Sequence, residues 1–255
     1  MSPQGGALAG RVAVISGASG GIGRAAVEAF LAAGARVVAL DRAAPALPPP
    51  GPDLLPLAGD VTVPAACAAA VEAALARWGA LHVLFNVAGI SGRRLGDGPT
   101  HLCSLEGWDA VLEGNLRSVF LMCRAALPAL IASGGGSIVN LASVLGLVGG
   151  GEAFATHAYA ASKAGVVGLT RAIAVHYAPQ RVRANALAPG LTATPMAARA
   201  LGDDAVLAHV RRMQPLLAGP VGAPQVAAAA VFLASEAAAA ITGAVLPVDG
   251  GWTAQ

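Results

Sequence analysis

Two side chains able to exchange protons stand four residues apart in the stretch HAYAASKAG, residues 157–165. Tyr159 is one of two tyrosines, and Lys163 is the only lysine among sixteen residues that are lysine or arginine. On a helix, residues four apart share a face, so the phenol and the ammonium would lie together. A phenol can protonate a developing alkoxide if its pKa of about 10 is lowered, as a nearby cation would do. The pair therefore predicts proton transfer to a carbon-bound oxygen, as the reduction of a ketone by hydride requires.

The choice of lysine at position 163 supports this interpretation. Lysine offers a compact charge with three rotatable donors, which can reach the hydroxyls of a ribose as well. The wider planar guanidinium of arginine fits such a small space poorly. Taken alone, the pair leaves a second interpretation open, which is a structural tyrosine and a surface lysine at chance spacing.

A glycine-rich turn near the N-terminus predicts a phosphate site. The segment SGASGGIG (16–23) follows an apolar run of strand length and precedes apolar residues at helical spacing. Glycines let the backbone approach a pyrophosphate, and the free N–H groups at a helix start attract anions. The spacing Gly-x-x-x-Gly-x-Gly, in a chain with 33 glycines, also fits an ordinary tight turn, so the motif depends on its context.

Acidic residues after the next two strands provide that context. Asp41 ends the second predicted strand, where a carboxylate can accept hydrogen bonds from both adenosine ribose hydroxyls and repel a 2′-phosphate. Arg42 follows directly and would neutralise a phosphate if Asp41 turned away, so NAD is predicted over NADP without NADP being excluded. Asp60, in the segment DVT, is expected to meet the adenine amino group. An ordinary strand-end aspartate stays the alternative for Asp41.

Apolar runs of strand length alternate with helical stretches along the chain. Runs that are apolar on both faces belong inside a parallel sheet covered by helices, with right-handed crossovers. The predicted fold is a single α/β domain over residues 1–255, a doubly wound (Rossmann) parallel sheet of about seven strands with helices on both faces. The expected strands are 11–16, 36–41, 54–60, 81–89, 136–143, 181–188 and 244–250. The expected helices are 22–33, 64–78, 104–132, 156–178, 203–213 and 224–235, and the proline-rich segment 44–53 is expected to be a rigid surface loop.

The composition narrows the functional classes. The chain is 56% hydrophobic and 12% charged with a net charge of +2, and so lean a charged surface suggests coverage by other subunits. The chain contains no run of basic residues with interleaved aromatics, so nucleic-acid binding is not expected. Glycines, serines and a proline break the longest uncharged run, 125–151, so no membrane span is expected. The N-terminus lacks a basic leader, and Cys67, Cys103 and Cys123 lack metal-ligand spacing, so we expect no metal and a cytoplasmic, reducing location.

Taken in their order, these motifs resemble those of the short-chain dehydrogenase/reductase (SDR) family over nearly the full chain. The resemblance implies an NAD(P)-dependent enzyme that acts on CH–OH groups and assembles as a homotetramer through its long apolar helices. The matching segments are SGASGGIG (16–23), LD (40–41), GDV (59–61), NVAG (86–89), GN (114–115), GSIVNLAS (136–143), YAASK (159–163), NALAPGLTATPM (185–196) and ITGAVLPVDGG (241–251).

The resemblance also implies roles for individual residues. Tyr159 would be the general acid in reduction and the base in oxidation, and Ser143 would hold the substrate oxygen beside it. Lys163 would bind the nicotinamide ribose and lower the tyrosine pKa, and Asn115 would help to hold a water that passes protons to Lys163. The implied cofactor-binding residues are Gly17, Ser19, Gly21, Ile22, Gly23, Asp41, Arg42, Asp60, Val61, Asn86, Ala88, Gly89, Tyr159, Lys163, Pro189, Gly190, Thr192 and Thr194. Two other asparagines, Asn140 and Asn185, are expected to satisfy backbone groups of loops.

Departures from the family pattern bear on the substrate. Val87 stands where a second asparagine is frequent, Ala142 replaces a frequent serine, and the spacing from Ser143 to Tyr159 is a few residues longer than usual. The segments 144–157 and 195–214 are expected to form a substrate loop and a lid. The apolar pocket between them is predicted to contain Leu145, Phe154, Met196, Leu201 and Met213.

The predicted function is hydride transfer between NAD(H) and a secondary alcohol or ketone, with Tyr159 as the general acid/base. One alternative is an NADPH-dependent reductase of 3-oxoacyl thioesters on acyl carrier protein, against which Asp41 argues. A second is a non-catalytic nucleotide-binding protein on the same scaffold.

Overall fold

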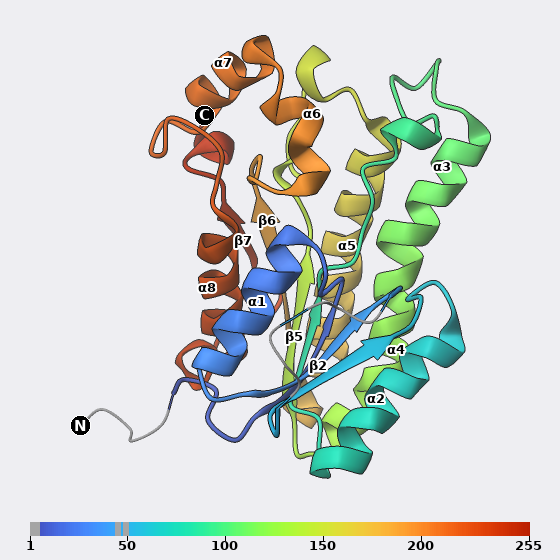
Figure 1. The fold of residues 1–255 in the computed structure, drawn as a ribbon, viewed down its shortest axis with the longest axis vertical. Coiled ribbons are helices and arrows are strands. Elements are labelled where there is room, and N and C mark those ends of the chain that lie inside the picture. The colour runs from blue at the N-terminus through green and yellow to red at the C-terminus, as the bar shows by residue number, and fades with distance from the viewer. Residues whose placement is uncertain (1–5, 44–46, 48–50) are drawn as a thin grey trace.

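The computed structural model describes residues 6–43, 47 and 51–255. Within this part of the chain, seven parallel strands form one sheet in the order β3-β2-β1-β4-β5-β6-β7 (Figure 1). All predicted strands are present, and the doubly wound parallel sheet is confirmed. The strands are β1 (Val12–Ser16), β2 (Arg36–Asp41), β3 (Leu54–Ala58), β4 (Val83–Asn86), β5 (Gly136–Leu141), β6 (Val182–Pro189) and β7 (Val245–Val248).

Helices cover both faces of the sheet. One face carries α1 (Gly21–Ala32) and α8 (Ala223–Ala234), and the other carries α2 (Pro64–Trp78), α4 (Ser118–Ala132) and α5 (His157–His176) (Figure 1). The other described α-helices are α3 (Leu105–Leu112), α6 (Ala198–Leu201) and α7 (Asp204–Met213). The six predicted helical stretches are confirmed, whereas α6 is too short for its residues to show a helical period.

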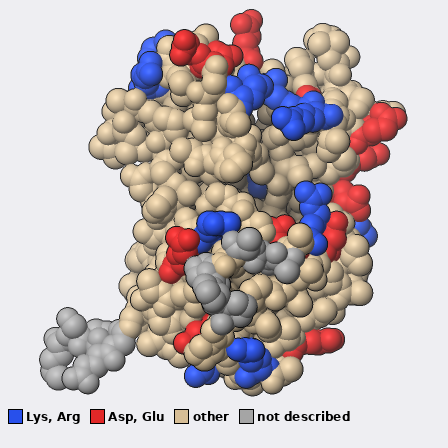
Figure 2. All heavy atoms as spheres, viewed as in Figure 1, with Lys and Arg blue, Asp and Glu red and all other residues tan. Residues whose placement is uncertain are grey.

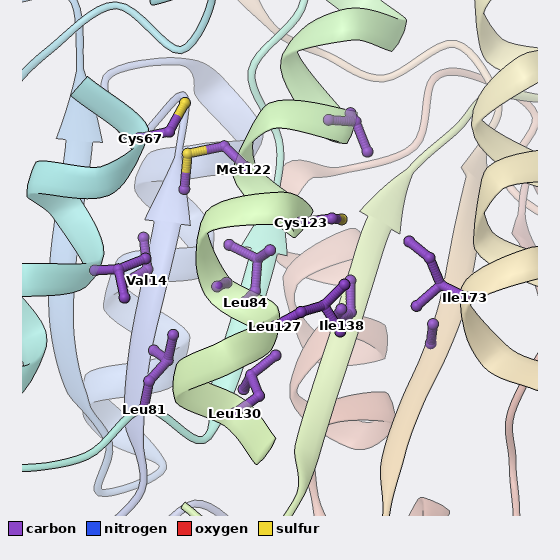
Figure 3. Packing of buried hydrophobic residues seen from close by; sticks show 14 of the residues in the cluster. Val14, Cys67, Leu81, Leu84, Met122, Cys123, Leu127, Leu130, Ile138 and Ile173 are labelled. Atoms are coloured by element: carbon purple, nitrogen blue, oxygen red, sulfur yellow. The ribbon is translucent and has the colours of Figure 1, made fainter. Parts of the chain in front are cut away.

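Successive residues of the central strands point into two separate cores. Val14 of β1 belongs to the core beneath α2 and α4, and Ile15 belongs to the core beneath α1 and α8. Figure 3 shows the first core, in which side chains from α4 lie against the sheet, among them Met122, Leu127 and Leu130. Because helices cover both faces, the central strands are mainly apolar, and the segments that leave the strands at the sheet edge are where side chains can meet a ligand.

The predicted helix 104–132 contains an interruption. A π-helical turn, Glu113–Arg117, separates α3 from α4, and the buried Asn115 lies at its centre. Such turns are often found at functional sites, and hydrophobic periodicity does not reveal them. Within the described residues, the run Leu105–Ala132 is the one helix long and apolar enough to cross a membrane by length and composition. Just over half of its most apolar window is buried inside the protein, as in a core helix.

The predicted loop 44–53 lies largely outside the described residues, so its conformation stays a prediction. Its end is described: Gly51 forms an isolated bridge with Leu54, and the Arg77 side chain of α2 donates to the Gly51 carbonyl at 3.0 Å.

Candidate active site

A cleft of about 990 Å³ follows the carboxyl ends of the strands. Its walls come from the segments after β1 to β6, which parallel strands place at one edge of a doubly wound sheet. Figure 2 shows this face hollowed beneath the α6 segment. Every residue of the predicted cofactor set except Asn86 lines the cleft, and Ser143 lines it too.

The glycine turn after β1 leaves no room for side chains. Gly17 has a φ of 70°, and a Cβ there would lie 2.7 Å from the Ala88 backbone. A Cβ on Gly23 would lie 2.0 Å from the Gly17 carbonyl oxygen, and one on Gly21 would lie 2.7 Å from the Thr194 side chain. The turn is therefore a bare backbone cradle at the start of α1, where unpaired N–H groups attract anions. These residues fit the pyrophosphate of a dinucleotide.

Two carboxylates mark the predicted adenosine end. Asp41 accepts hydrogen bonds from the backbone N–H of Ser19 at 2.8 Å and of Arg42 at 2.7 Å, which hold it against the glycine turn. Asp60 accepts from the backbone N–H of Thr62 at 2.9 Å and from its hydroxyl at 2.8 Å. These bonds, with a further contribution from the charge of Arg42, lower the pKa of Asp60.

The predicted proton donor lies beside the predicted substrate-holding serine. Ser143 lies two residues beyond the end of β5, and Tyr159 lies in the first turn of α5. Burial raises the pKa of Tyr159, and a side-chain hydrogen bond with Ser143 opposes this only in part. Desolvation of the phenolate thus outweighs this hydrogen bond, and the lowering of this pKa by Lys163 stays a prediction.

Lys163 is buried, which excludes the alternative of a surface lysine. Its Nζ donates to the backbone carbonyl of Leu141 at 2.7 Å and lies 5.7 Å from the centre of the Tyr159 ring. Burial lowers the lysine pKa to about 8. A Cβ added to Gly89 would lie 3.5 Å from Nζ. The ammonium is thus fixed over the tyrosine ring in a confined space.

Asn115 joins the segment after β4 to α5. Its Oδ1 accepts from the N–H of Ile90 at 2.7 Å, and its Nδ2 donates to the Ile90 carbonyl at 3.0 Å and to the Ser162 hydroxyl at 3.1 Å. The side chain therefore braces the two segments that carry Gly89 and Lys163.

The remaining asparagines serve the fold. Asn86 donates to Asn140 at 2.9 Å, and Asn140 donates to the Thr170 hydroxyl at 2.9 Å, all within the core. Asn185 pairs with the backbone of the segment before β7, as expected of a structural residue. Asn86 belongs to the predicted cofactor set, but it is the last residue of β4, and the wall of the cleft begins at Val87.

Asp97 is a residue of the site that the sequence patterns do not reveal. It is buried, and its two oxygens accept the backbone N–H groups of Ala158 and Tyr159, each at 3.0 Å. Thr156, the residue before α5, makes no capping bond with its side chain. Asp97 therefore caps α5 from 62 residues away in sequence and sets the position of Tyr159.

The apolar end of the cleft differs in part from the predicted pocket. The predicted residues that line it are Leu145, Phe154 and Met196, and those that do not are Leu201 and Met213. Met213 instead packs against the small core of the lid segment. Trp252 contributes to the cleft wall, with its ring edge-to-face against Phe154 at 5.4 Å. No pattern indicated this tryptophan, because it comes from the chain end and meets the lid only in the folded protein.

A family model described as enoyl-(acyl carrier protein) reductase matches residues 17–253. The match extends over the glycine turn, the tyrosine–lysine pair and the lid. The chain belongs to the short-chain dehydrogenase/reductase family. The resemblance inferred from the motifs is thus confirmed.

Relatives of nearly equal length agree. A 2-(R)-hydroxypropyl-CoM dehydrogenase of Xanthobacter autotrophicus is 40% identical over 96% of this chain and 99% of its own. A cis-4-hydroxycyclohexanecarboxylate dehydrogenase of Sinomonas cyclohexanicum is 41% identical over 98% and 100%. The ligand-free structure of aldohexose dehydrogenase from Thermoplasma acidophilum is 32% identical, with a TM-score of 0.86 over 97% of this chain and 96% of that one.

These comparisons establish the reaction class. The SDR enzyme is an oxidoreductase that uses a nicotinamide nucleotide and interconverts a secondary alcohol and a ketone. Although the family model carries an acyl-carrier-protein description, relatives at 36–41% identity are dehydrogenases of alcohols, so the thioester alternative is not better supported.

Replacing Asp97 should loosen the start of α5. In Asp97→Asn one oxygen becomes an NH₂ group facing a backbone N–H, so we expect the free energy of unfolding to fall by about 2 kcal/mol and turnover to fall with it. Urea denaturation and steady-state assays measure both. Asp109→Asn, at an exposed position of α3, is the matched control. Wild-type stability in Asp97→Asn would contradict the capping role.

Lys163 should make stability depend on pH. Its pKa is about 8 in the folded protein against an ordinary 10.5, so between these values the unfolded chain holds a proton that the folded protein lacks. The free energy of unfolding should therefore rise with pH in this window by about 1.4 kcal/mol per pH unit. Below pH 8 the lysine is charged in both states, so the folded protein bears the full cost of burying the charge. Urea denaturation of wild type and Lys163→Met isolates this contribution. Across this pH window the free energy of unfolding of the wild type should rise by about 3 kcal/mol relative to that of the variant. A difference between the two proteins that does not change with pH would count against a buried, titrating lysine.

Proposed function

We propose that this enzyme oxidises a secondary alcohol, or reduces the ketone, with NAD(H), and that Tyr159 exchanges the proton. One observation carries the proposal: the end of β5 and the start of α5 bring Ser143, Tyr159 and Lys163 together on the wall of the cleft that the glycine turn enters. The bound dinucleotide supplies or accepts the hydride. The protein groups handle the proton and hold the substrate oxygen.

Each of the three side chains then has a separate task. Ser143 donates a hydrogen bond to the substrate oxygen and keeps it beside the phenol. Tyr159 gives its proton to the forming alkoxide in reduction and takes one back in oxidation. Because burial raises its pKa, the phenol is protonated and ready for reduction. Oxidation needs the phenolate, which the Lys163 ammonium and the positive charge of an oxidised nicotinamide both favour.

Asn115 and Lys163 support a proton route away from the tyrosine. A Cβ on Gly89 would lie 2.9 Å from the Asn115 Oδ1 and 3.5 Å from the Lys163 Nζ, so both groups approach the same bare stretch of backbone. A lysine pKa of about 8 lets this group gain and lose a proton near neutral pH. In this proposal Lys163 passes protons between Tyr159 and a water held near Asn115.

The preference for NAD rests on Asp41. Its carboxylate is fixed at the end of β2 by the Ser19 and Arg42 N–H groups and lines the cleft. A 2′-phosphate would meet this negative charge, whereas ribose hydroxyls would donate hydrogen bonds to it. The charge of Arg42 acts on Asp60, which supports its guanidinium lying toward that carboxylate.

The assembly state remains a prediction. Large apolar side chains are exposed along α3 and α4, among them Leu105, Trp108 and Phe120, which supports the expected homotetramer. Sedimentation velocity tests it, and a monomer would contradict it.

Replacing the phenol should abolish the chemistry. Tyr159→Phe removes the exchanged proton, so kcat should fall by about a thousandfold or more while NADH still binds. Rates measured with a panel of secondary alcohols and NAD, followed by the absorbance of NADH, test this. Tyr177→Phe, which alters the other tyrosine at the far end of α5, is the control. Retained turnover in Tyr159→Phe would refute the assigned proton donor.

Removing the Asp41 charge should change cofactor choice. In Asp41→Asn the repulsion of a 2′-phosphate is lost and the ribose hydroxyls lose a strong acceptor, so the ratio of the NADPH to the NADH dissociation constant should fall about tenfold or more. Fluorescence titration of both reduced cofactors measures the ratio. Asp53→Asn, at the amino edge of the sheet, removes an equal charge away from the cleft. A wild-type enzyme that prefers NADPH would overturn the proposed specificity.

A further inference from the structure

Three arginines line the cleft beyond the predicted dinucleotide site. Arg93 and Arg94 lie in the turn Arg93–Leu95 after β4, and Arg199 lies in α6 of the lid segment. Figure 2 shows basic side chains gathered over the α6 region, above the hollow. These arginines share this end of the cleft with the apolar side chains of Leu145 and Met196.

Two of these guanidinium groups converge on one backbone atom. The Nη2 of Arg93 and the Nη2 of Arg199 donate to the carbonyl oxygen of Ala153, at 3.5 and 3.4 Å. Ala153 belongs to the loop between Ser143 and Tyr159, so the cluster is tied to the segment that flanks the reacting groups. Both hydrogen bonds are long, and a guanidinium has five N–H donors, so most of the donors remain for a ligand.

The positive charge of this cluster is only partly compensated by the protein. Burial and the neighbouring charge of Arg199 lower the pKa of Arg93, whereas the charge of Asp97 raises it. Within the described part of the chain, neither Arg93 nor Arg94 forms an ion pair within 4.0 Å. The buried Asp97 already accepts two N–H groups of α5.

Two further carboxylates of this region are engaged. Asp203 lies 3.9 Å from Arg199 but accepts the N–H groups that cap α7. Glu113, which lines the cleft, pairs with Arg117 at 2.7 Å. Two like charges held together at a cleft form a site for an anion, and of the three arginines only Arg199 has an acidic partner within the described residues, at 3.9 Å. A planar carboxylate or sulfonate matches the guanidinium fork.

We propose that Arg93 and Arg199, assisted by Arg94, bind an anionic group on the substrate, so that the preferred substrates are secondary alcohols or ketones carrying a carboxylate or sulfonate. The inference rests on the proposed function, because it takes the reacting oxygen to lie at Ser143 and Tyr159. The apolar wall between the two sites accommodates the carbon chain that joins the anion to the carbonyl. The lid segment then contributes to specificity, because α6 carries Arg199.

Oxo acids and their neutral esters test the proposal. The series 4-oxopentanoate, 5-oxohexanoate and 6-oxoheptanoate places a carboxylate at increasing distance from the ketone, and each methyl ester removes the charge while adding one methyl group. With NADH, kcat/KM for the acid should exceed that for its ester by about tenfold or more at one chain length at least. In the double variant Arg93→Gln/Arg199→Gln the ratio should fall toward one. Arg36→Gln, at the amino edge of the sheet, should keep the wild-type ratio.

A binding measurement separates failure of this inference from failure of the proposed function. Calorimetry with NAD-saturated enzyme reports ketone binding without turnover. If no ketone is reduced, yet one acid binds more tightly than its ester and the double variant abolishes the difference, the anion site stands and the proposed reaction falls. Equal binding of acids and esters, or no binding of either, overturns the anion site. A double variant that loses NADH affinity tenfold but keeps its acid preference would assign the arginines to the cofactor phosphates and also overturn it.

Discussion

The buried ammonium of Lys163 is the interaction on which the site depends. Burial disfavours its charge enough to lower its pKa to about 8, and the hydrogen bond to the Leu141 carbonyl offsets part of that cost. The lysine must therefore reach the end of β5 through a narrow space bounded by the Tyr159 ring and the bare backbone at Gly89. That requirement explains a lone lysine in a chain that otherwise uses arginine.

The rest of the fold serves to bring this group to the dinucleotide cleft. Parallel strands deliver every loop of the site to one edge, and the close approaches between those loops require glycine. A side chain at Gly17 would strike the segment after β4, and one at Gly21 would strike the segment after β6. Asn115 and Asp97 then tie these loops to α5 through buried hydrogen bonds. The site is rigid because its walls are braced against one another, not because each loop is stable alone.

The sequence predicted what depends on local pattern. Runs that are apolar on both faces predict the parallel sheet. The observed bounds of β2 and α2 equal the predicted ones, and those of the other predicted elements agree within a few residues. The motif residues lie at the cleft, because a glycine turn or a strand-end carboxylate can be read from its own neighbours. Asp97, Trp252 and the raised pKa of Tyr159 arise from burial and from partners distant in sequence, so no local pattern predicts them. Asn86 does not line the cleft, because the family motif extends one residue inside the strand.

The charged side chains that line the cleft differ from one end of it to the other. Asp41, Arg42 and Asp60 line the predicted adenosine end, Lys163 lies beside the Tyr159 ring, and the other three arginines line the end formed by the lid segment. In a confined, partly apolar cleft such charges act over longer distances than in water. In the proposed anion site, an anionic substrate entering from the lid side is therefore drawn toward Arg93 and Arg199. In the proposed function Asp41 disfavours a 2′-phosphate at one end of the cleft, and in the proposed anion site the arginines hold the substrate's anionic group at the other, which leaves its ketone to face Tyr159 between them.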